Sequence, residues 1–349
     1  MRRLPWKVWI KTIIGGLYYH SGLFSAHLWL RRRRGQELLV LAFHRIVPAE
    51  SVVIREHLSL RCIVLSAENL SELIRFLKDH FQIVSLQECI RSHSKGPPVS
   101  TRCLITFDDG YRDFVSHAWP IVKRSKIPVT MFVPTSLLST GHSFWWDRVY
   151  RAAMTLGERD MAGVGGHAGQ LLRKISRTTV ASRPSLVYQL IEYLQDWRSA
   201  DIGRLIEQMG APDPRLLEQA NQLLTWKDVI KLHEEGVSFG SHTRCHPNLK
   251  LLSKEEVERE IGHSKVDLET ALKTPVQSFA YPGGHRSVEM EQVLERAGYK
   301  VAFGTEKGFN SREHDVFWLR RINIWDGMLQ NHRGRFSRSA FAFTLMMSR

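Results

Sequence analysis

Two acidic residues and two histidines stand at spacings that suit a metal site. Asp108 and Asp109 are adjacent in Thr106-Phe107-Asp108-Asp109-Gly110, directly after an apolar run. His242 and His246 are four residues apart and also follow an apolar run, so one turn of chain can present both imidazoles to one side. Two neutral imidazoles and one carboxylate can hold a divalent ion and leave a position for water. Each motif alone is more often a plain turn or a surface pair, but together they predict a metal centre.

A third segment could place a backbone amide beside a ligand. Phe279-Ala280-Tyr281-Pro282-Gly283-Gly284 ends an apolar run in a sharp turn. Residues without bulky side chains let a backbone N–H approach a ligand closely, as stabilisation of an oxyanion requires. Alone, this segment would be interpreted as a simple turn.

Strand-like and helical patterns alternate along the chain from about residue 38. A capping box at Ser253-Lys-Glu-Glu256, for example, opens a helical pattern that continues to Leu272. Such alternation predicts an α/β fold with a parallel sheet, open or closed into a barrel, whose strand ends carry the three motifs. The predicted strands are Leu38–Phe43, Ile83–Ser85, Cys103–Phe107, Val129–Val133, Val237–Gly240, Gln277–Tyr281, Tyr299–Phe303 and Trp318–Ile324.

Residues from about 148 to 224 show no strand pattern. A helical stripe runs from Leu186 through Leu190 to Leu194, and a second one includes Leu216, Leu217, Leu223 and Leu224. We therefore predict a mostly helical insertion in the barrel.

The three motifs, in this order and each at a strand end, resemble the polysaccharide deacetylases with a NodB homology domain, carbohydrate esterase family four. The resemblance covers about Leu38 to Ile324 without the insertion. It implies a distorted (β/α) barrel with fewer than eight regular strands. It also implies a metal-dependent deacetylase that hydrolyses N-acetyl groups of a polysaccharide or lipid-linked glycan. The expected cofactor is a divalent metal, with zinc as the expected ion, held by Asp109, His242 and His246.

The same resemblance implies roles for other residues. Asp108 is the expected catalytic base, which takes a proton from the attacking water. Tyr281 and Gly283 belong to the turn whose backbone amide helps to hold the oxyanion.

The chain departs from the family pattern in two places. Many members carry an arginine shortly before the Pro282 position to orient the base, but Ala280 stands there, so Arg321 becomes the candidate. No C-terminal Leu-x-x-His motif supplies the usual acid. His44 is the candidate catalytic acid, with a structural histidine beneath the site as the alternative.

A second class of function remains open, namely a catalytically silent glycan-binding or assembly protein with the same fold. The intact Asp108, Asp109, His242 and His246 favour the enzyme. The segment Phe144-Trp145-Trp146-Asp147 could stack on sugar rings or anchor a core, and the sequence leaves both interpretations open.

The first 36 residues form a basic, aromatic-rich segment, and residues 37–349 form the predicted barrel with its insertion. Eight Lys and Arg residues precede the first acid, Glu37, so the rest of the chain carries only +6 of the net charge of +14. Thr12–Leu30 has no formal charge, but glycines, histidines and serines dilute it. We expect attachment to an anionic membrane surface through residues 1–36. A true membrane span, or a basic helix packed on its own domain, are the alternatives.

Two further expectations concern partners and compartment. The single arginine cluster lies beside an apolar stretch, so no nucleic acid is expected as a partner. The four cysteines show neither CxxC pairing nor the density of a disulfide scaffold, which favours a reduced, intracellular setting. The predicted location is therefore the cytoplasmic side of a membrane.

Overall fold

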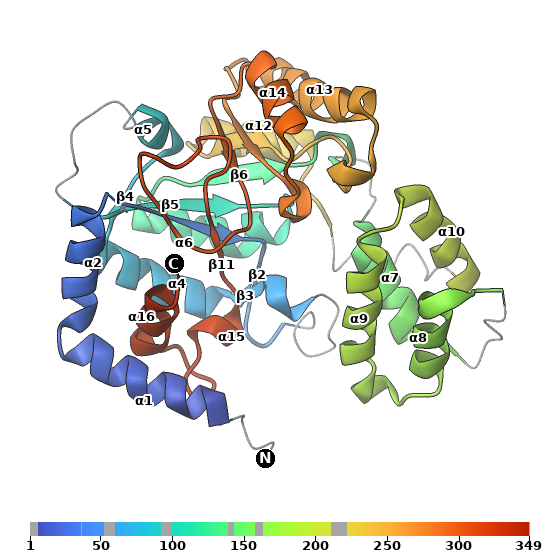
Figure 1. Cartoon of the computed structure of the whole chain (residues 1–349), viewed down its shortest axis with the longest axis horizontal. Helices are drawn as coiled ribbons and strands as arrows, with labels where there is room; N and C mark the ends of the chain where they lie inside the picture. The colour runs from blue at the N-terminus through green and yellow to red at the C-terminus, as the bar shows by residue number, and fades with distance from the viewer. Residues whose placement is uncertain are drawn as a thin grey trace.

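A curled β-sheet with helices around it forms the centre of the fold (Figure 1). The computed structural model describes residues 6–35, 37–51, 60–91, 100–138, 143–157, 163–210 and 222–348, without the side chains of 6–11 and 61.

The main sheet has nine strands in the order β10-β1-β5-β6-β7-β8-β9, with β11 beside β1 and β4 beside β5. Neighbours from β1 to β9 run parallel, whereas β10 is antiparallel to β1. The predicted α/β fold is thus confirmed, with a mixed rather than purely parallel sheet. The strands are β1 (Leu38–Phe43), β4 (Gln82–Ile83), β5 (Arg102–Phe107), β6 (Thr130–Val133), β7 (Ser238–Ser241), β8 (Ser278–Ala280), β9 (Val301–Phe303), β10 (Phe309–Asn310) and β11 (Ile322–Asn323).

Residues 316–324 join the two edges of this sheet. The Leu319 N–H donates to Ala302 O on β9 at 2.9 Å, and a few residues later Ile322 pairs with Leu41 on β1. The chain therefore passes from β9, at one end of the sheet, to β1, near the other end, which confirms a distorted barrel. Only Ile322–Asn323 of the predicted strand Trp318–Ile324 is regular, because the segment changes partner along its length.

A separate two-stranded sheet lies beside the barrel and was not anticipated. It consists of β2 (Arg45–Val47) and β3 (Val64–Ser66), which pair in parallel. Both strands are only three residues long, too short for a periodic signal in the sequence.

Helices with well-formed N-termini connect the strands. Ser253 and Glu256 form the predicted capping box at the start of α13, and Thr225 and Asp228 form another at α12. The connecting helices are α4 (Ala67–His80), α5 (Leu86–Arg91), α6 (Trp119–Ser125), α12 (Trp226–Glu234), α13 (Lys254–Leu272) and α14 (Val288–Arg296).

Of the described helices between β6 and β7, all but α12 form a group of their own at the side of the barrel (Figure 1). They are α7 (Trp145–Met154), α8 (Gly166–Ser176), α9 (Pro184–Leu194) and α10 (Ser199–Met209). Leu172, Leu190 and Leu205 lie in a hydrophobic cluster that is distinct from that of the barrel.

The boundaries of this group differ from those predicted for the insertion. The first helix begins at Trp145 rather than near residue 148. At the other end, Leu223 pairs with Tyr111 and the Leu224 N–H donates to Gly110 O at 2.8 Å, so neither leucine continues a helical stripe. Leu216 and Leu217 lie outside the described residues.

The N-terminal segment forms a helical hairpin that packs on the barrel domain. Helices α1 (Trp6–His20) and α2 (Leu23–Arg33) lie against α16 (Arg338–Met346) near the C-terminus (Figure 1). At Gly15 a Cβ atom would stand 2.5 Å from Ser339 O, so this approach to α16 requires glycine. Tyr18 and Phe24 are buried in the same cluster as the barrel core.

In the described part of the segment, the basic helices therefore pack on their own domain, which was one of the alternatives. Tyr18 and Phe24 face inward and are unavailable as membrane anchors. Arg31 is also buried, with its guanidinium 4.4 Å from the centre of the Phe309 ring. Among the described helices, none is long and apolar enough to cross a membrane.

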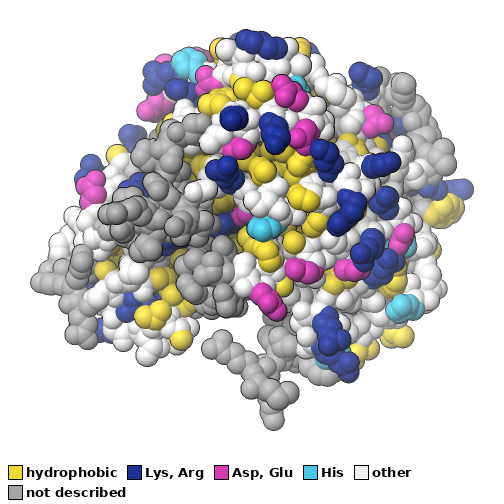
Figure 2. Space-filling view, turned by 180° about the vertical axis from the view of Figure 1, so that it is seen from behind, with side chains coloured by type: hydrophobic (Ala, Val, Ile, Leu, Met, Phe, Trp, Pro, Cys, Tyr) yellow, Lys and Arg dark blue, Asp and Glu magenta, His cyan; other side chains and the backbone are white. Residues whose placement is uncertain are grey.

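Charged side chains of both signs lie on the side of the molecule opposite that of Figure 1. Figure 2 shows Lys and Arg side chains over its upper and right parts, interspersed with Asp and Glu.

Candidate metal centre and active-site pocket

The two adjacent aspartates stand where β5 ends. The Asp108 N–H donates to Phe43 O at 2.8 Å, so pairing with β1 extends to this residue. The chain then turns through Asp109 (φ 72°) and Gly110 (φ 69°). A Cβ on Gly110 would stand 3.0 Å from Val133 Cγ1, so a glycine suits both the backbone angle and the space. This turn points the two carboxylates in different directions and gives them different partners.

The two histidines lie in a tight loop after β7. The His242 N–H donates to Val133 O at 3.1 Å, and Thr243 and His246 both have positive φ angles. Glu260 of α13 accepts the N–H groups of Arg244 and Cys245 at 2.8 and 2.9 Å. Asp109, Thr243 and His246 are three of the five described non-glycine residues with positive φ. Such strain persists only where surrounding contacts hold it, and here it brings both imidazoles to one side.

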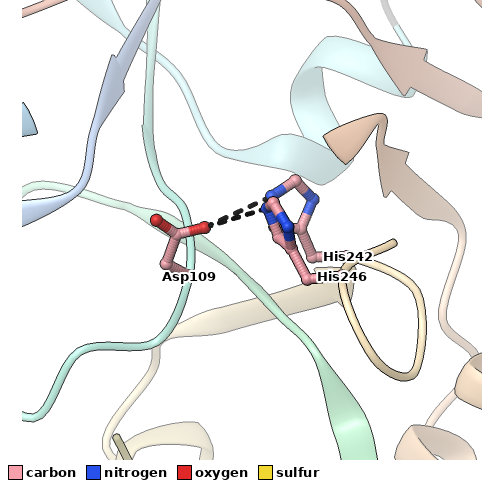
Figure 3. Close-up of side chains that lie close together, drawn as sticks. All are labelled: Asp109, His242 and His246. Carbon is pink, nitrogen blue, oxygen red and sulfur yellow. Dashed lines mark ion pairs between the residues drawn. The ribbon is translucent and has the colours of Figure 1, made fainter. Parts of the chain in front are cut away.

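Asp109, His242 and His246 form a compact cluster of possible metal ligands. Asp109 Oδ1 lies 3.5 Å from His242 Nε2 and 3.4 Å from His246 Nε2. One ligand atom from each residue lies within 4.8 Å of the others. Figure 3 shows both imidazoles facing the same carboxylate oxygen.

The hydrogen bonding and charge of this cluster fit a divalent ion. His242 Nδ1 is 2.7 Å from Ala280 O, and since a carbonyl only accepts, Nδ1 carries a proton, which leaves Nε2 as the ring nitrogen that can bind an ion. Burial alone would raise the pKa of Asp109, but the two imidazoles outweigh it and hold that pKa well below its usual range. Burial also lowers the pKa of His246, which favours its neutral form. An ionised carboxylate and neutral imidazoles are the protonation states that bind zinc.

Asp108 has a different partner, the arginine suggested by the sequence. Arg321 Nη1 and Nη2 donate to Asp108 Oδ1 and Oδ2, each at 2.8 Å, and both side chains are buried. The Arg321 Nε donates to Gly304 O at 2.9 Å, which fixes the guanidinium. Burial alone would raise the pKa of Asp108, but Arg321 outweighs it and lowers the pKa. Asp108 is therefore an oriented carboxylate at neutral pH, suited to accept a proton.

His44 follows β1 and lines the same pocket as both carboxylates. It contributes to the lowered pKa of Asp108 and of Asp109, so its ring lies within electrostatic reach of each. Its Nδ1 is buried and has no hydrogen-bond partner among the described residues. No described residue therefore holds the His44 ring in place through a hydrogen bond at Nδ1.

The turn after β8 leaves one backbone N–H available. The Tyr281 N–H already donates to Phe303 O at 3.0 Å, and Pro282 has no N–H. Gly283 is exposed, and no hydrogen bond between described residues uses its N–H. Of the two residues predicted from this turn, Gly283 therefore offers the amide, whereas Tyr281 offers a buried side chain.

One pocket at the strand ends brings all of these groups together. Its lining includes every site residue predicted from the sequence, namely His44, Asp108, Asp109, His242, His246, Tyr281, Gly283 and Arg321. It also includes residues that were not predicted, among them Leu60, Ile63, Gln195, Thr305 and Asn323. Asn323 could have been found, because alternate residues of a strand share a face and it stands two after Arg321. No sequence signal places Gln195 in the pocket.

The aromatic segment that opens the helical group has two buried rings and one partly buried ring. Phe144 and Trp146 stack with ring centres 4.2 Å apart, and the Trp146 ring lies 4.8 Å from that of His246. Both are buried, so they anchor a core against the metal cluster. Asp147 is also buried and accepts a hydrogen bond from Tyr111. Trp145 is only partly buried.

The barrel, with a three-residue cluster and an Asp–Arg pair at its strand ends, defines the class of protein. Residues 95–168 and 199–302, together about half of the chain, match the model of the family described as polysaccharide deacetylase. The chain belongs to the polysaccharide deacetylase family. His44 and Arg321 lie outside the matched residues.

Individual relatives agree with this assignment. A protein of Bacillus subtilis (strain 168), YxkH, described as a polysaccharide deacetylase, is 27% identical over 116 residues, covering 33% of this chain and 42% of that protein. The match thus spans less than half of the relative's length.

Solved structures share the fold. Deacetylase PplD of Streptococcus pyogenes, in complex with acetate, has a TM-score of 0.56 at 21% identity and covers 85% of this chain and 95% of its own. IcaB of Ammonifex degensii has a TM-score of 0.55 at 16% identity, covering 88% and 97%. A de-N-acetylase of Aggregatibacter actinomycetemcomitans has a TM-score of 0.54 at 16% identity, covering 87% and 99%.

Proposed function

We propose that the protein is a metal-dependent deacetylase that hydrolyses N-acetyl groups of a polysaccharide or lipid-linked glycan. The observation that carries the proposal is the placement of an ionised, arginine-held Asp108 beside the Asp109–His242–His246 cluster in one pocket. One protein with the same fold is named a de-N-acetylase, which supports the choice of an N-acetyl group. Zinc suits a donor set of two imidazoles and one carboxylate.

Each residue of the pocket has a separate role in the proposed hydrolysis. A divalent ion held by Asp109, His242 and His246 would polarise the acetyl carbonyl and lower the pKa of water. Asp108 accepts the proton of the attacking water, while Arg321 keeps both carboxylate oxygens oriented. The Gly283 N–H donates to the oxyanion as it develops. His44 gives a proton to the departing amine, so that acetate and a free amino sugar are released.

Acetate release from a panel of N-acetylated glycans, with and without a chelator, tests this function. We expect release from at least one glycan, its loss with the chelator and its recovery on addition of zinc. If acetate release continues in the presence of the chelator, and measurement shows that the metal has been removed, the activity does not depend on metal. Glycan binding without any acetate release would favour the silent glycan-binding alternative.

We expect His44→Ala to slow turnover without loss of metal. Removal of a general acid typically lowers the rate by about a hundredfold or more, because the departing amine is no longer protonated. Single-turnover acetate release, metal content and a melting curve together measure this effect.

His80→Ala is the matched control for the structural alternative. His80 packs against Phe24 and Phe76 and hydrogen-bonds Tyr19, away from the pocket. It should lower the melting temperature and leave turnover unchanged. If His44→Ala behaves as His80→Ala does, His44 is a structural histidine and the acid must be sought elsewhere.

We also propose that the N-terminal hairpin attaches the protein to an anionic membrane surface. Ile13, Ile14 and Leu17 form one face of α1 and are 60%, 44% and 70% exposed, opposite the face that packs on α16. Leu23 and Trp29 on the rest of the hairpin are 58% and 46% exposed. The surrounding segment carries bases and no acid before Glu37. An apolar face beside positive charge is the combination that binds anionic lipid surfaces.

Binding to vesicles tests this attachment without truncation, because removal of the hairpin would expose the barrel core. Leu17→Glu should abolish binding to vesicles that contain phosphatidylglycerol, since it places a negative charge in the apolar face. Val266→Glu is the matched control, because Val266 is 59% exposed on the distant helix α13. Equal binding by native protein and Leu17→Glu protein would exclude this face as the anchor. The cytoplasmic side of the membrane stays a prediction.

A further inference from the structure

A second, smaller groove adjoins the active-site pocket between the helical group and the barrel. Trp145 and Trp197 line it from the helical group, and His285 lines it from the turn after β8. Gln195 and Gly283 line both this groove and the active-site pocket. The two spaces therefore share walls, and a chain-like substrate that fills the pocket can continue into the groove.

Two residues of the groove lie outside the part of the chain that matches the family model. The match ends at residue 168 and resumes at 199, so Gln195 and Trp197 lie in the unmatched stretch.

The wall is attached to the barrel at a defined point. The Asn248 side-chain amide, in the loop that follows the metal-ligand histidines, donates to Gln195 O at 2.9 Å. This hydrogen bond positions the end of α9, and with it the nearby Trp197, over the rim of the barrel. Trp197 is further supported by an edge contact with Tyr193, their ring centres being 5.9 Å apart.

The lining combines aromatic faces with polar groups. Trp145 and Trp197 are partly buried, so each keeps some ring surface accessible. Gln195 is exposed and His285 is partly buried, and both can hydrogen-bond a ligand. Burial, followed by the charge of Lys250, lowers the pKa of His285, so its neutral ring can both donate and accept. Sugars present apolar C–H faces and hydroxyl edges, which match aromatic faces and polar groups respectively.

We infer that this groove is a subsite for the sugar that neighbours the deacetylated one in a glycan chain, with Trp197 as its main platform. The inference rests on the proposed function, because the pocket must hold an acetylated sugar for the groove to hold its neighbour. An acyl chain suits the groove less well, because the polar side chains of Gln195 and His285 would lose water without gaining partners.

Binding of N-acetylglucosamine oligomers of one, two and four residues, in β-1,4 and β-1,6 linkage, tests the subsite. Calorimetry with zinc-loaded, full-length Asp108→Asn protein avoids turnover. We expect the two-residue ligand of at least one linkage to bind about tenfold more tightly than the single sugar. Trp197→Ala should remove most of this gain and leave single-sugar binding unchanged, whereas Trp197→Phe should restore much of it.

Val180→Ala is the matched control, since Val180 is 56% exposed in the helical group and does not line the groove. It should leave the length dependence unchanged. The subsite assignment is wrong if affinity does not rise from one to two sugars in any linkage, or if Trp197→Ala protein keeps that rise. It is also wrong if Trp197→Ala weakens the binding of one sugar as much as that of two. Preference for a fatty-acyl probe in the groove would overturn it in favour of a lipid site.

Acetate release by the native zinc-loaded protein from the same oligomers separates this inference from the proposed function. If acetate release still increases with oligomer length in Trp197→Ala protein, the subsite assignment is wrong. The proposed deacetylase activity is then still supported. The opposite outcome is binding that increases with oligomer length and requires Trp197, but no acetate release from any glycan of the wider panel. That outcome would support the subsite and contradict the proposed deacetylase activity.

Discussion

Asp108→Asn protein will keep its metal and lose turnover by about a hundredfold to ten-thousandfold. The amide has the shape of the carboxylate but cannot accept a proton at neutral pH, and Asp108 is not one of the three clustered ligands. The substitution also leaves Arg321 buried without its charge partner, so the free energy of unfolding should fall by about 3 kcal/mol. Metal content, acetate release and thermal melting of the same preparation measure the three effects separately.

Asp113→Asn is a matched control for the loss of a buried ion pair. Asp113 Oδ2 accepts from Arg45 Nε at 2.8 Å, and this pair does not line the active-site pocket. It should destabilise the protein in a similar way while turnover per folded molecule stays near normal. If Asp108→Asn protein keeps near-normal turnover, or if Asp113→Asn loses as much as Asp108→Asn, then Asp108 is not the base.

His246→Ala will remove the metal and abolish activity. It takes away one of three ligands, and because substitutions of residues that merely support ligands already weaken metal binding about 10- to 100-fold, a larger loss is expected here. Zinc measured after dialysis against a weak chelator should fall from about one ion per protein molecule to a small fraction. Addition of excess zinc should restore little turnover, since the remaining two ligands do not fix the ion.

Cys245→Ser controls for damage to the histidine loop and for a thiol ligand. Cys245 is exposed and precedes His246, and its backbone N–H contacts Glu260 whichever side chain is present. The variant should retain metal and activity. Unchanged zinc content in His246→Ala protein would refute the assigned cluster, whereas loss of zinc in Cys245→Ser protein would point to the thiol.

The sequence determined the location of the chemistry along the chain. Asp108, Asp109, His242 and His246 each follow a buried apolar run, and parallel strands carry their functional residues at the C-terminal ends. Strand positions such as Leu38–Phe43 and the capping box at Ser253 were predictable because they depend on local periodicity and local hydrogen bonds.

Contacts between distant segments were only partly predictable. Arg321 could be suggested, because an expected arginine was missing near Pro282, but its contact with Asp108 depends on the path of residues 316–324 between two strands. Gln195 carried no signal, since its position in the pocket results from the packing of the helical group and the hydrogen bond from Asn248. The three-residue strands β2 and β3 were missed for lack of any period.

The N-terminal segment illustrates the same division most clearly. Its composition showed a basic, aromatic-rich stretch without acids, which suits a membrane surface. Composition does not reveal which side chains face inward. Only the tertiary structure decided that Tyr18, Phe24 and Arg31 face the domain, whereas Ile13, Ile14 and Leu17 face outward. Local sequence specifies an element and its amphipathic character, but the partner of each face is set by packing between segments far apart in the chain.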